Sequence, residues 1–565
     1  MPGQPSGRRR LTTRQSSMPM VDMGQTSLKL VAKLGLSNFQ LLQCMLAVVV
    51  SLHAADGAML PAVFKALEEG LQGATPVSLG VIVLVEALCH SLAVFAWGIL
   101  ADYGCKLCLL QWATLAWGCL TLATAFVNSI TSLAVIRALA GIVGAALAPL
   151  AQGLIGAVCP PGQRGRAFGA LVACGQAGHI LGLLMAGSTS HLGAIGGWRG
   201  SFAMFALFTI GLSWVLAQVR TEVSAGLFIE SQTWQMLAIQ GTRSTGSWTH
   251  LFMEVGQNVS VILSRRSFIV LIMQGAFACT TVKAMQYQVM WYQYLGFDDL
   301  TSSAITSAAP LGCLAGAIAS GHLSDWLAAR LPNHGRVFMG QAADTVKFIV
   351  LILIFVLCGS LDAQSTGSIA VMAILSFLFG FVSIMAYAGV VKPLFVEIVP
   401  PQLIAQVIGF AAAVDGAFSS FASTPVVGFI TEHLFHYKET RTPIRYMDDS
   451  LRMSNAAALG HAIAAVTLTS TTLTVLSFGL LHITYPKERQ QCGAEAAWAG
   501  SEREGAPAIE DDMASTTPTE EAEALQVRTG PMSSSGSSSS RSSRGARGSD
   551  GRGKSVKFKM DYGSV

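Results

Sequence analysis

Long runs of apolar residues alternate with short polar stretches along most of this chain. Each run extends over about 20 residues, the length that an α-helix needs to cross the hydrocarbon core of a bilayer. A helix is the expected form of each run because it satisfies its own backbone hydrogen bonds in lipid. The pattern therefore predicts an all-α integral membrane protein with twelve transmembrane helices. The predicted spans are 40–63, 78–101, 107–127, 132–156, 167–189, 200–219, 267–291, 302–322, 338–361, 367–391, 403–431 and 457–484.

The spacing of these runs divides the chain. Six spans come before a polar stretch at 220–266 and six come after it, which predicts two six-helix lobes, 38–219 and 267–485, joined by a cytoplasmic linker. Residues 1–37 are polar and basic, and residues 486–565 are rich in Ser, Gly and charge. We expect both of these tails to be disordered because they cannot bury a core.

Composition supports a membrane protein and excludes other classes. Of the 565 residues, 52% are hydrophobic and only 12% are charged, against about 25% charged residues in soluble chains. The net charge of +4 is small, and the basic residues sit in short clusters, which fits orientation in a membrane better than nucleic-acid binding. Lys and Arg gather in alternate loops, which predicts that both termini face the cytoplasm. These inner loops include Lys106, Arg164, Arg166, Arg265 and Arg266.

A short motif occurs once in each half of the chain. Gly98–Asp102 (Gly-Ile-Leu-Ala-Asp) follows the second span, and Gly321–Asp325 (Gly-His-Leu-Ser-Asp) follows the eighth. A base comes a few residues later in both cases, Lys106 in the first half and Arg330 in the second. Pro pairs also follow the fourth and tenth spans. The two halves are therefore predicted to be structural repeats, as in many transporters.

Three segments resemble a known family. Gly98–Lys106 looks like the cytoplasmic loop signature of the major facilitator superfamily, with Cys105 where Arg or Lys is usual. Arg137–Gly144 is similar to the fourth-helix signature, and Gly197–Phe202 looks like the entry to the sixth helix. The resemblance implies the two-lobed major facilitator fold and transport by alternating access. It also implies that Asp102 acts in gating.

Within that superfamily, two groups are similar to this chain. Asp56–Pro61 resembles the first helix of spinster-type lipid transporters, although Gly57 replaces the usual Arg and the fourth-helix Glu is absent. Residues 291–298, 395–402 and 415–420 look closer to a plant and protist group of facilitators related to spinsters. The resemblance thus implies transport without naming a substrate.

Several ionisable residues lie inside the apolar runs. Each would cost about 2.5–3.5 kcal/mol at a helix centre facing lipid, so together they would cost on the order of 20 kcal/mol. They are therefore expected to pair, to face a water-filled cavity or to lie near helix ends. Four acids and three bases nearly balance: Asp56, Glu86, Asp344 and Asp415 against Arg137, Lys283 and Lys347.

The resemblance implies that helices one, four, seven and ten line a central cavity. Asp56, Arg137 and Lys283 are then candidates to contact a solute or a proton. Asp56 is the favoured proton site, because a carboxylate near the bend expected at Pro61 would be partly desolvated. Arg137 could instead hold Asp56 as a charged structural partner, and both options stay open. Polar candidates on the same helices are Gln274 and Tyr387.

The remaining charges suggest more local roles. Glu86 and His90 share one helix face at i,i+4, as either a second proton site or a packed pair. Asp344 and Lys347, at i,i+3, are expected to form a structural pair. Asp415 is expected to find a base in the second half.

We therefore predict a secondary transporter that moves a small organic or amphiphilic solute, with proton coupling as one option. No segment matches Gly-x4-Gly-Lys-Ser/Thr, and Cys105 and Cys108 lack a second ligand pair for a metal. We expect no catalytic residues, no metal and no cofactor. The expected partners are the solute and membrane lipids, without nucleic acid. A spinster-like lysolipid or sphingolipid transporter and a substrate-sensing receptor on a transporter fold are the alternatives.

Overall fold

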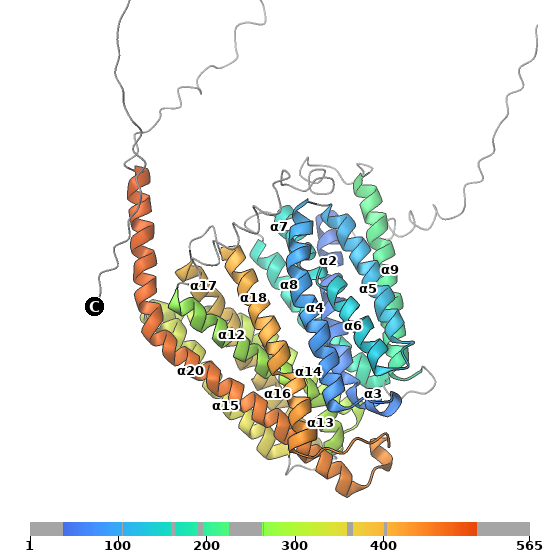
Figure 1. Ribbon diagram of the computed structural model, residues 1–565. Coiled ribbons are helices and arrows are strands. Elements are labelled where there is room, and N and C mark those ends of the chain that lie inside the picture. Colours follow the sequence, from blue (N-terminus) through green and yellow to red (C-terminus); the bar gives the residue numbers. More distant parts are fainter. Residues whose placement is uncertain are drawn as a thin grey trace, which may run out of the picture. The chain divides into compact units, whose positions relative to one another are not determined.

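The computed structural model describes residues 38–103, 105–159, 164–189, 196–224, 263, 265–358, 365–399 and 404–504. The predicted tail 1–37, the tail beyond 504 and most of the predicted linker, 225–262, lie outside the described residues. The helices up to Gly500 belong to one compact unit. All regular elements among the described residues are helices (Figure 1).

The first half of the chain holds the helices that we call the N lobe. They are α2 (Asn38–Ala62), α3 (Phe64–Gly70), α4 (Pro76–Tyr103), α5 (Lys106–Thr124), α6 (Ile130–Gly144), α7 (Leu147–Val158), α8 (Arg164–Thr189) and α9 (Trp198–Ser224). α2 packs against α8, α4 against α6, and α5 against α9.

The second half holds the C lobe. Its elements are α12 (Arg266–Ala284), η3 (Met285–Tyr287), α13 (Gln288–Leu295), α14 (Asp299–Arg330), α15 (Gly335–Cys358), α16 (Thr366–Ala386), η4 (Tyr387–Val391), α17 (Lys392–Ile398), α18 (Ile404–Ala422), α19 (Thr424–Phe429), η6 (Ile430–Leu434), η7 (Ile444–Tyr446) and α20 (Asp449–Glu504). α14 packs against α16, and α12 against α18.

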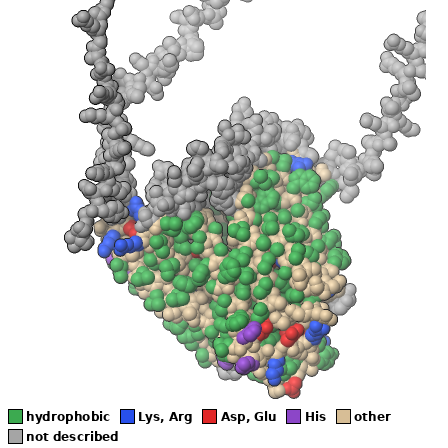
Figure 2. Space-filling model, viewed as in Figure 1, with side chains coloured by type: hydrophobic (Ala, Val, Ile, Leu, Met, Phe, Trp, Pro, Cys, Tyr) green, Lys and Arg blue, Asp and Glu red, His purple; other side chains and the backbone are tan. Residues whose placement is uncertain are grey.

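Twelve helical stretches of the described chain are long and apolar enough to cross a membrane, as the hydrophobic pattern predicts. Hydrophobic side chains cover the middle of the face in Figure 2, whereas the charged side chains visible there lie toward the ends of the helices. The span count and the all-α architecture predicted above are confirmed. One span of the sequence often comprises two or three consecutive elements, such as α6 and α7 or α12, η3 and α13.

Proline explains two of these interruptions. A proline removes a backbone donor, and its ring clashes with the carbonyl four residues earlier. α6 ends just before Ala145, four residues ahead of Pro149. The π-helical element η4 includes Gly389, which lies four residues before Pro393. Local sequence thus accounts for these two interruptions.

Two boundaries differ from the sequence-based expectation. α3 is a separate short helix in a stretch that was expected to be only an outer loop. α20 runs to Glu504 and so enters the predicted C-terminal tail, which was expected to begin at 486. The added segment is rich in Ala, Glu, Gln and Arg, which are good helix formers.

The lobes meet along two seams, where α8 packs against α14 and where α4 packs against α18 and α19. We call the two ends of the lobes the α3 end and the opposite end. The α3 end contains α3, the start of α4, the start of α14 and the segment between η6 and α20 (Figure 1, bottom). The opposite end contains the turns between α4 and α5 and between α14 and α15.

Candidate functional site

The most concentrated charged cluster within the spans is a triad of Asp56, Arg137 and Glu86. Arg137 Nη1 and Nη2 each donate to Asp56 at 3.1 Å. The same guanidinium donates to Glu86 from Nε at 3.0 Å and from Nη2 at 2.5 Å. Arg137 is therefore bidentate to both carboxylates, the strongest arrangement for such groups. With both carboxylates ionised, the triad has a net charge of −1.

Each member of the triad comes from a different helix. Asp56 is on α2, Glu86 on α4 and Arg137 on α6. Gly141, one turn after Arg137, lies so close to the carbonyl of Glu86 that a Cβ would collide with it. The spaced glycines of the Arg137–Gly144 segment thus allow α6 to approach α4 and place the guanidinium between the two acids. This packing logic is common in membrane helices.

The two carboxylates have different surroundings. Arg137 is fully buried and the Asp56 side chain is only 5% exposed, whereas that of Glu86 is 22% exposed. Asp56 also accepts a hydrogen bond from Trp117 Nε1 at 3.3 Å. Asp56 is therefore the more enclosed of the two carboxylates.

Two histidines adjoin the triad. The His53 and His90 rings stack at 5.7 Å between centroids, and His53 also contacts the edge of Trp117. Glu86, which shares a helix face with His90, is bonded to Arg137. Among the described residues, the buried Nδ1 of His53 has no hydrogen-bond partner. His53 is not distinguished by the sequence, because it differs from other polar residues of α2 only in its tertiary neighbours.

The charges predicted for the C lobe form a different pattern. Lys347 Nζ lies 2.6 Å from Asp344, which also accepts from Gln274 Nε2 at 3.5 Å. All three side chains are buried. Gln274, a cavity candidate in the sequence, is therefore placed beside the Asp344–Lys347 pair within the lobe.

The other C-lobe candidates make fewer ionic contacts. Lys283 Nζ donates to the Gly416 carbonyl at 3.0 Å and to Ser420 Oγ at 2.8 Å. Asp415 is buried against Gly275, where a Cβ would collide with its carboxylate. Tyr387 begins the η4 element and has the Lys392 ammonium 4.9 Å from its ring centroid. Lys283, Asp415 and Tyr387 thus belong to α12, α18 and the α16–α17 junction.

The C-lobe motif Gly321–Asp325 is part of a network at the opposite end. Arg336 lies 2.9 Å from Asp325 and 3.0 Å from Glu397, and it donates to Ser324 Oγ at 2.7 Å. The base expected there was Arg330, but its guanidinium stacks on Trp326 instead. The side chains of i,i+5 residues on a helix do not share a face, whereas Arg336 returns to Asp325 on the next helix.

The N-lobe motif is described less fully. Gly98 lies in open surroundings, and Lys106 begins α5 with its methylene groups near Gly153. The Asp102 side chain is outside the described residues. Cys105 caps α5 by accepting from the Cys108 amide at 3.2 Å. Burial and the contact with Cys108 raise the pKa of the Cys105 thiol to about 11, so this cysteine is protonated at neutral pH.

A second buried charge cluster was not anticipated. Lys65 and Glu68 of α3 were expected only as charges of an outer loop, but they are buried and lie 2.9 Å apart. Tyr294 and Tyr437 of the C lobe donate to Glu68. The i,i+3 spacing of Lys65 and Glu68 can be read from the sequence, but their burial and their distant phenol partners cannot.

Twelve spans in two packed lobes with buried, paired charges define an integral multi-pass membrane protein of the two-lobed transporter class. The chain belongs to the Major Facilitator Superfamily, whose family model matches residues 46–423, and it is a transporter of that family. The predicted fold and family are thereby confirmed. No curated protein gives a significant sequence match.

Solved structures of transporters share this fold. A bacterial homologue of the human lysosomal transporter Spinster, inward-facing and unoccupied, is similar with a TM-score of 0.63 and 17% identity over 80% of this chain and 98% of that one. A D-xylose-proton symporter matches at 0.54 and 14% identity, over 76% and 96%. The nucleoside transporter NupG matches at 0.54 and 13% identity, over 76% and 98%. At these identities the likeness concerns the fold.

Proposed function

We propose that the chain is a proton-coupled secondary transporter of a small organic or amphiphilic solute, in which the Asp56–Arg137–Glu86 triad binds the coupling proton. The observation that supports this is the sharing of one guanidinium by two carboxylates. A single Arg can neutralise only one of them, so the triad retains a negative charge in a largely apolar environment. A proton on either acid removes that charge.

Glu86 is the acid that takes up the proton in this proposal. It is more exposed than Asp56, so water can reach it in one conformational state. Asp56 keeps a bidentate contact with Arg137 and a bond from Trp117. The sequence favoured Asp56 for this role and Glu86 as the second site. The geometry favours the reverse assignment, with Asp56 holding Arg137 in place.

Flux in liposomes tests the assignment. Wild type, Glu86→Gln and Asp56→Asn would be reconstituted under an imposed pH gradient with an internal pH dye. The solutes would be a pentose, a nucleoside and a lysophospholipid, taken from the structural neighbours and the spinster resemblance. We expect Glu86→Gln to lose gradient-driven accumulation while it retains exchange. Asp56→Asn should also lose thermal stability, because Arg137 then lacks its most enclosed partner.

A matched control is Asp415→Asn, which removes a membrane carboxylate that has no Arg partner among the described residues. It should keep its response to the pH gradient. If Glu86→Gln still concentrates solute as the wild type does, Glu86 is not the coupling site.

We also infer that the α3 end faces away from the cytoplasm, with both termini inside. The support is the concentration of Lys and Arg in the loops of the opposite end. Single cysteines at the exposed residues Gln72 and Leu331 report on the two ends. In intact cells, an impermeant maleimide should label position 72 and leave position 331 unlabelled. The reverse pattern would overturn the orientation.

A further inference from the structure

We propose that Lys65, Glu68, Tyr294 and Tyr437, together with the Thr440 carbonyl, form a latch that closes the transporter at the α3 end. The latch stabilises one state of the transport cycle, because its hydrogen bonds join the two lobes and break when the lobes separate there. It is independent of the solute and of the coupling proton.

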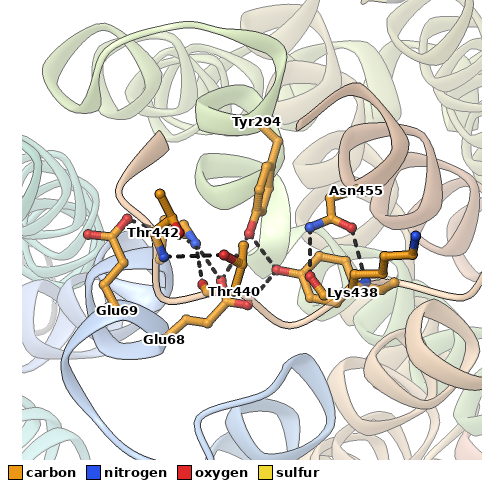
Figure 3. A network of polar contacts seen from close by, with 9 residues as sticks. Glu68, Glu69, Tyr294, Lys438, Thr440, Thr442 and Asn455 are labelled. Carbon is orange, nitrogen blue, oxygen red and sulfur yellow. Dashed lines mark hydrogen bonds and ion pairs between the residues drawn. The ribbon is translucent and has the colours of Figure 1, made fainter. Parts of the chain in front are cut away.

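The centre of the latch is the carboxylate of Glu68. Its Oε1 accepts from Tyr437 OH at 2.7 Å, and its Oε2 accepts from Tyr294 OH at 3.0 Å and from Lys65 Nζ at 2.9 Å. The two phenol oxygens are 2.5 Å apart. Figure 3 shows Glu68 and Tyr294 directed toward each other. Each carboxylate oxygen thus accepts from a phenol that lies outside α3.

The cation of the latch also reaches across the seam. Lys65 Nζ donates to the Thr440 carbonyl at 3.1 Å and lies 5.2 Å from the centroid of the Tyr294 ring. Glu69 adds a weaker contact to Lys65 at 3.8 Å. Lys65 and Glu68 belong to the N lobe, whereas Tyr294, Tyr437 and Thr440 belong to α13 and to the segment between η6 and α20. The latch therefore consists of contacts between lobes.

The C-lobe side of the latch is held in position. Asn455 of α20 accepts from the Lys438 amide at 3.0 Å and donates to the Lys438 carbonyl at 2.9 Å. This bracket fixes the backbone next to Tyr437, and Figure 3 shows Asn455 beside Lys438. Burial and the negative charge of Glu68 raise the pKa of Tyr437 well above its ordinary value. The phenol consequently stays protonated and remains a donor.

Burial makes these contacts specific to the closed state. The side chains of Lys65 and Glu68 are 1% and 0% exposed. Such a pair is stable away from water only when its partners satisfy it, and removing one partner of a buried charge is strongly destabilising. Separation of the lobes would expose both groups to water, which replaces the lost hydrogen bonds. The phenols and the Thr440 carbonyl therefore determine how tightly the α3 end stays shut.

The packing of glycines along the seams shows the same asymmetry. Near the α3 end, a Cβ on Gly80 would lie 2.6 Å from the Thr424 carbonyl and one on Gly428 would lie 2.5 Å from the Pro76 carbonyl. Farther along α4 and α18, Gly98 and Gly409 have nothing within 4 Å of such a Cβ. The two lobes are thus in backbone contact at the end where the latch lies.

Distance measurements between spin labels test the latch without any solute. One label pair, at Gln72 and Leu300, spans the lobes at the α3 end; a second pair, at Arg166 and Leu331, spans them at the opposite end. All four residues are exposed. The exposed cysteines Cys44 and Cys119 would be replaced beforehand. Measurements use the full chain in nanodiscs, as wild type, Tyr437→Phe and Lys65→Met.

We expect the wild type to occupy mainly the short distance between labels 72 and 300. Tyr437→Phe keeps the ring but removes a donor to Glu68, so it should raise the ratio of open to closed states at the α3 end several-fold. Lys65→Met removes the cation and should raise the same ratio about tenfold or more. The 166–331 distance should shorten in the same molecules. Tyr446→Phe and Glu439→Gln, exposed positions in the same segment, should match the wild type.

Two outcomes overturn the proposal. One is a 72–300 distance distribution in Tyr437→Phe that equals that of the wild type. Because this change is conservative, its result is decisive even if Lys65→Met fails to fold. The other is a longer 72–300 distance without any shortening of the 166–331 distance. The cluster would then support only the local structure of α3.

Discussion

The two ends of the transporter both carry a network of charged and phenolic side chains, but the networks join different parts. At the α3 end, Glu68 and Lys65 of the N lobe bond to Tyr294, Tyr437 and Thr440 of the C lobe. At the opposite end, Arg336 binds Asp325 and Glu397, and Tyr485 also bonds to Glu397; all four residues belong to the C lobe.

This difference shows which contacts can report on the transport cycle. A network within one lobe moves as a rigid part and contributes mainly to the stability of that lobe. A network between lobes must break and re-form in each cycle. Buried polar groups between the lobes therefore bias the equilibrium between open and closed states, whereas similar groups inside one lobe need not affect it.

The largest expected effect is that of a side chain at the tight seam. Gly80→Val would place carbon atoms against the Thr424 backbone, which cannot move aside as a flexible side chain could. Overpacking of this kind costs about 1–3 kcal/mol, so the ratio of closed to open states at the α3 end should fall about fivefold or more. The 72–300 spin-label distance should lengthen, and flux should fall strongly.

Gly409→Ala on α18 is the matched control, since nothing lies within 4 Å of its Cβ position. Its distances and flux should stay near those of the wild type. If both substitutions gave the same distances, the asymmetry between the two ends would be refuted.

A smaller effect is expected from breaking the network around Arg336 at the opposite end. Arg336→Ala removes the partner of Asp325 and Glu397 and should lower the free energy of unfolding by about 1–2 kcal/mol, as expected for charged hydrogen bonds that are partly exposed. Arg330→Ala should cost about 1 kcal/mol or less, because that residue loses only a surface cation–π contact. Thermal unfolding in detergent measures both.

Spin-label distances at the α3 end distinguish the two networks in the same samples. They should be unchanged in Arg336→Ala, since its contacts lie within the C lobe. A lengthened 72–300 distance in this variant would mean that the opposite network also controls closure.

The smallest expected effect is that of salt. The Debye length shortens from about 30 Å at 0.01 M to about 3 Å at 1 M, which screens exposed pairs far more than buried ones. The Arg336–Asp325 pair, in which Asp325 is 74% exposed, should weaken with salt. The latch should not, because Lys65 and Glu68 are enclosed. The difference between wild type and Tyr437→Phe at the α3 end should thus be the same at both salt concentrations.

Much of the candidate site was visible in the chain before its structure. Asp56, Glu86 and Arg137 stand out as charges within apolar runs, and Asp344 and Lys347 stand at helical spacing, where they do pair. The roles assigned to these residues stay predictions.

The pairing of these charges was harder to predict from the sequence. Arg137 was considered as a partner of Asp56, but its second bond to Glu86 depends on the close approach of α6 and α4 at Gly141. Arg330 was chosen as the base for Asp325 because it is near in sequence. Arg336 occupies that position because α15 folds back along α14.

By itself, the sequence determined the twelve spans, the all-α architecture and the family, because each span must satisfy its backbone hydrogen bonds internally and must therefore be long, apolar and helical. These are local properties that periodicity and composition record. Only the tertiary structure decided that α3 is a buried helix and that Glu68 meets Tyr437, which is 369 residues away. Whether a charge is enclosed and paired depends on which helices pack together, and that arrangement is set by shape across the whole chain rather than by neighbours in sequence.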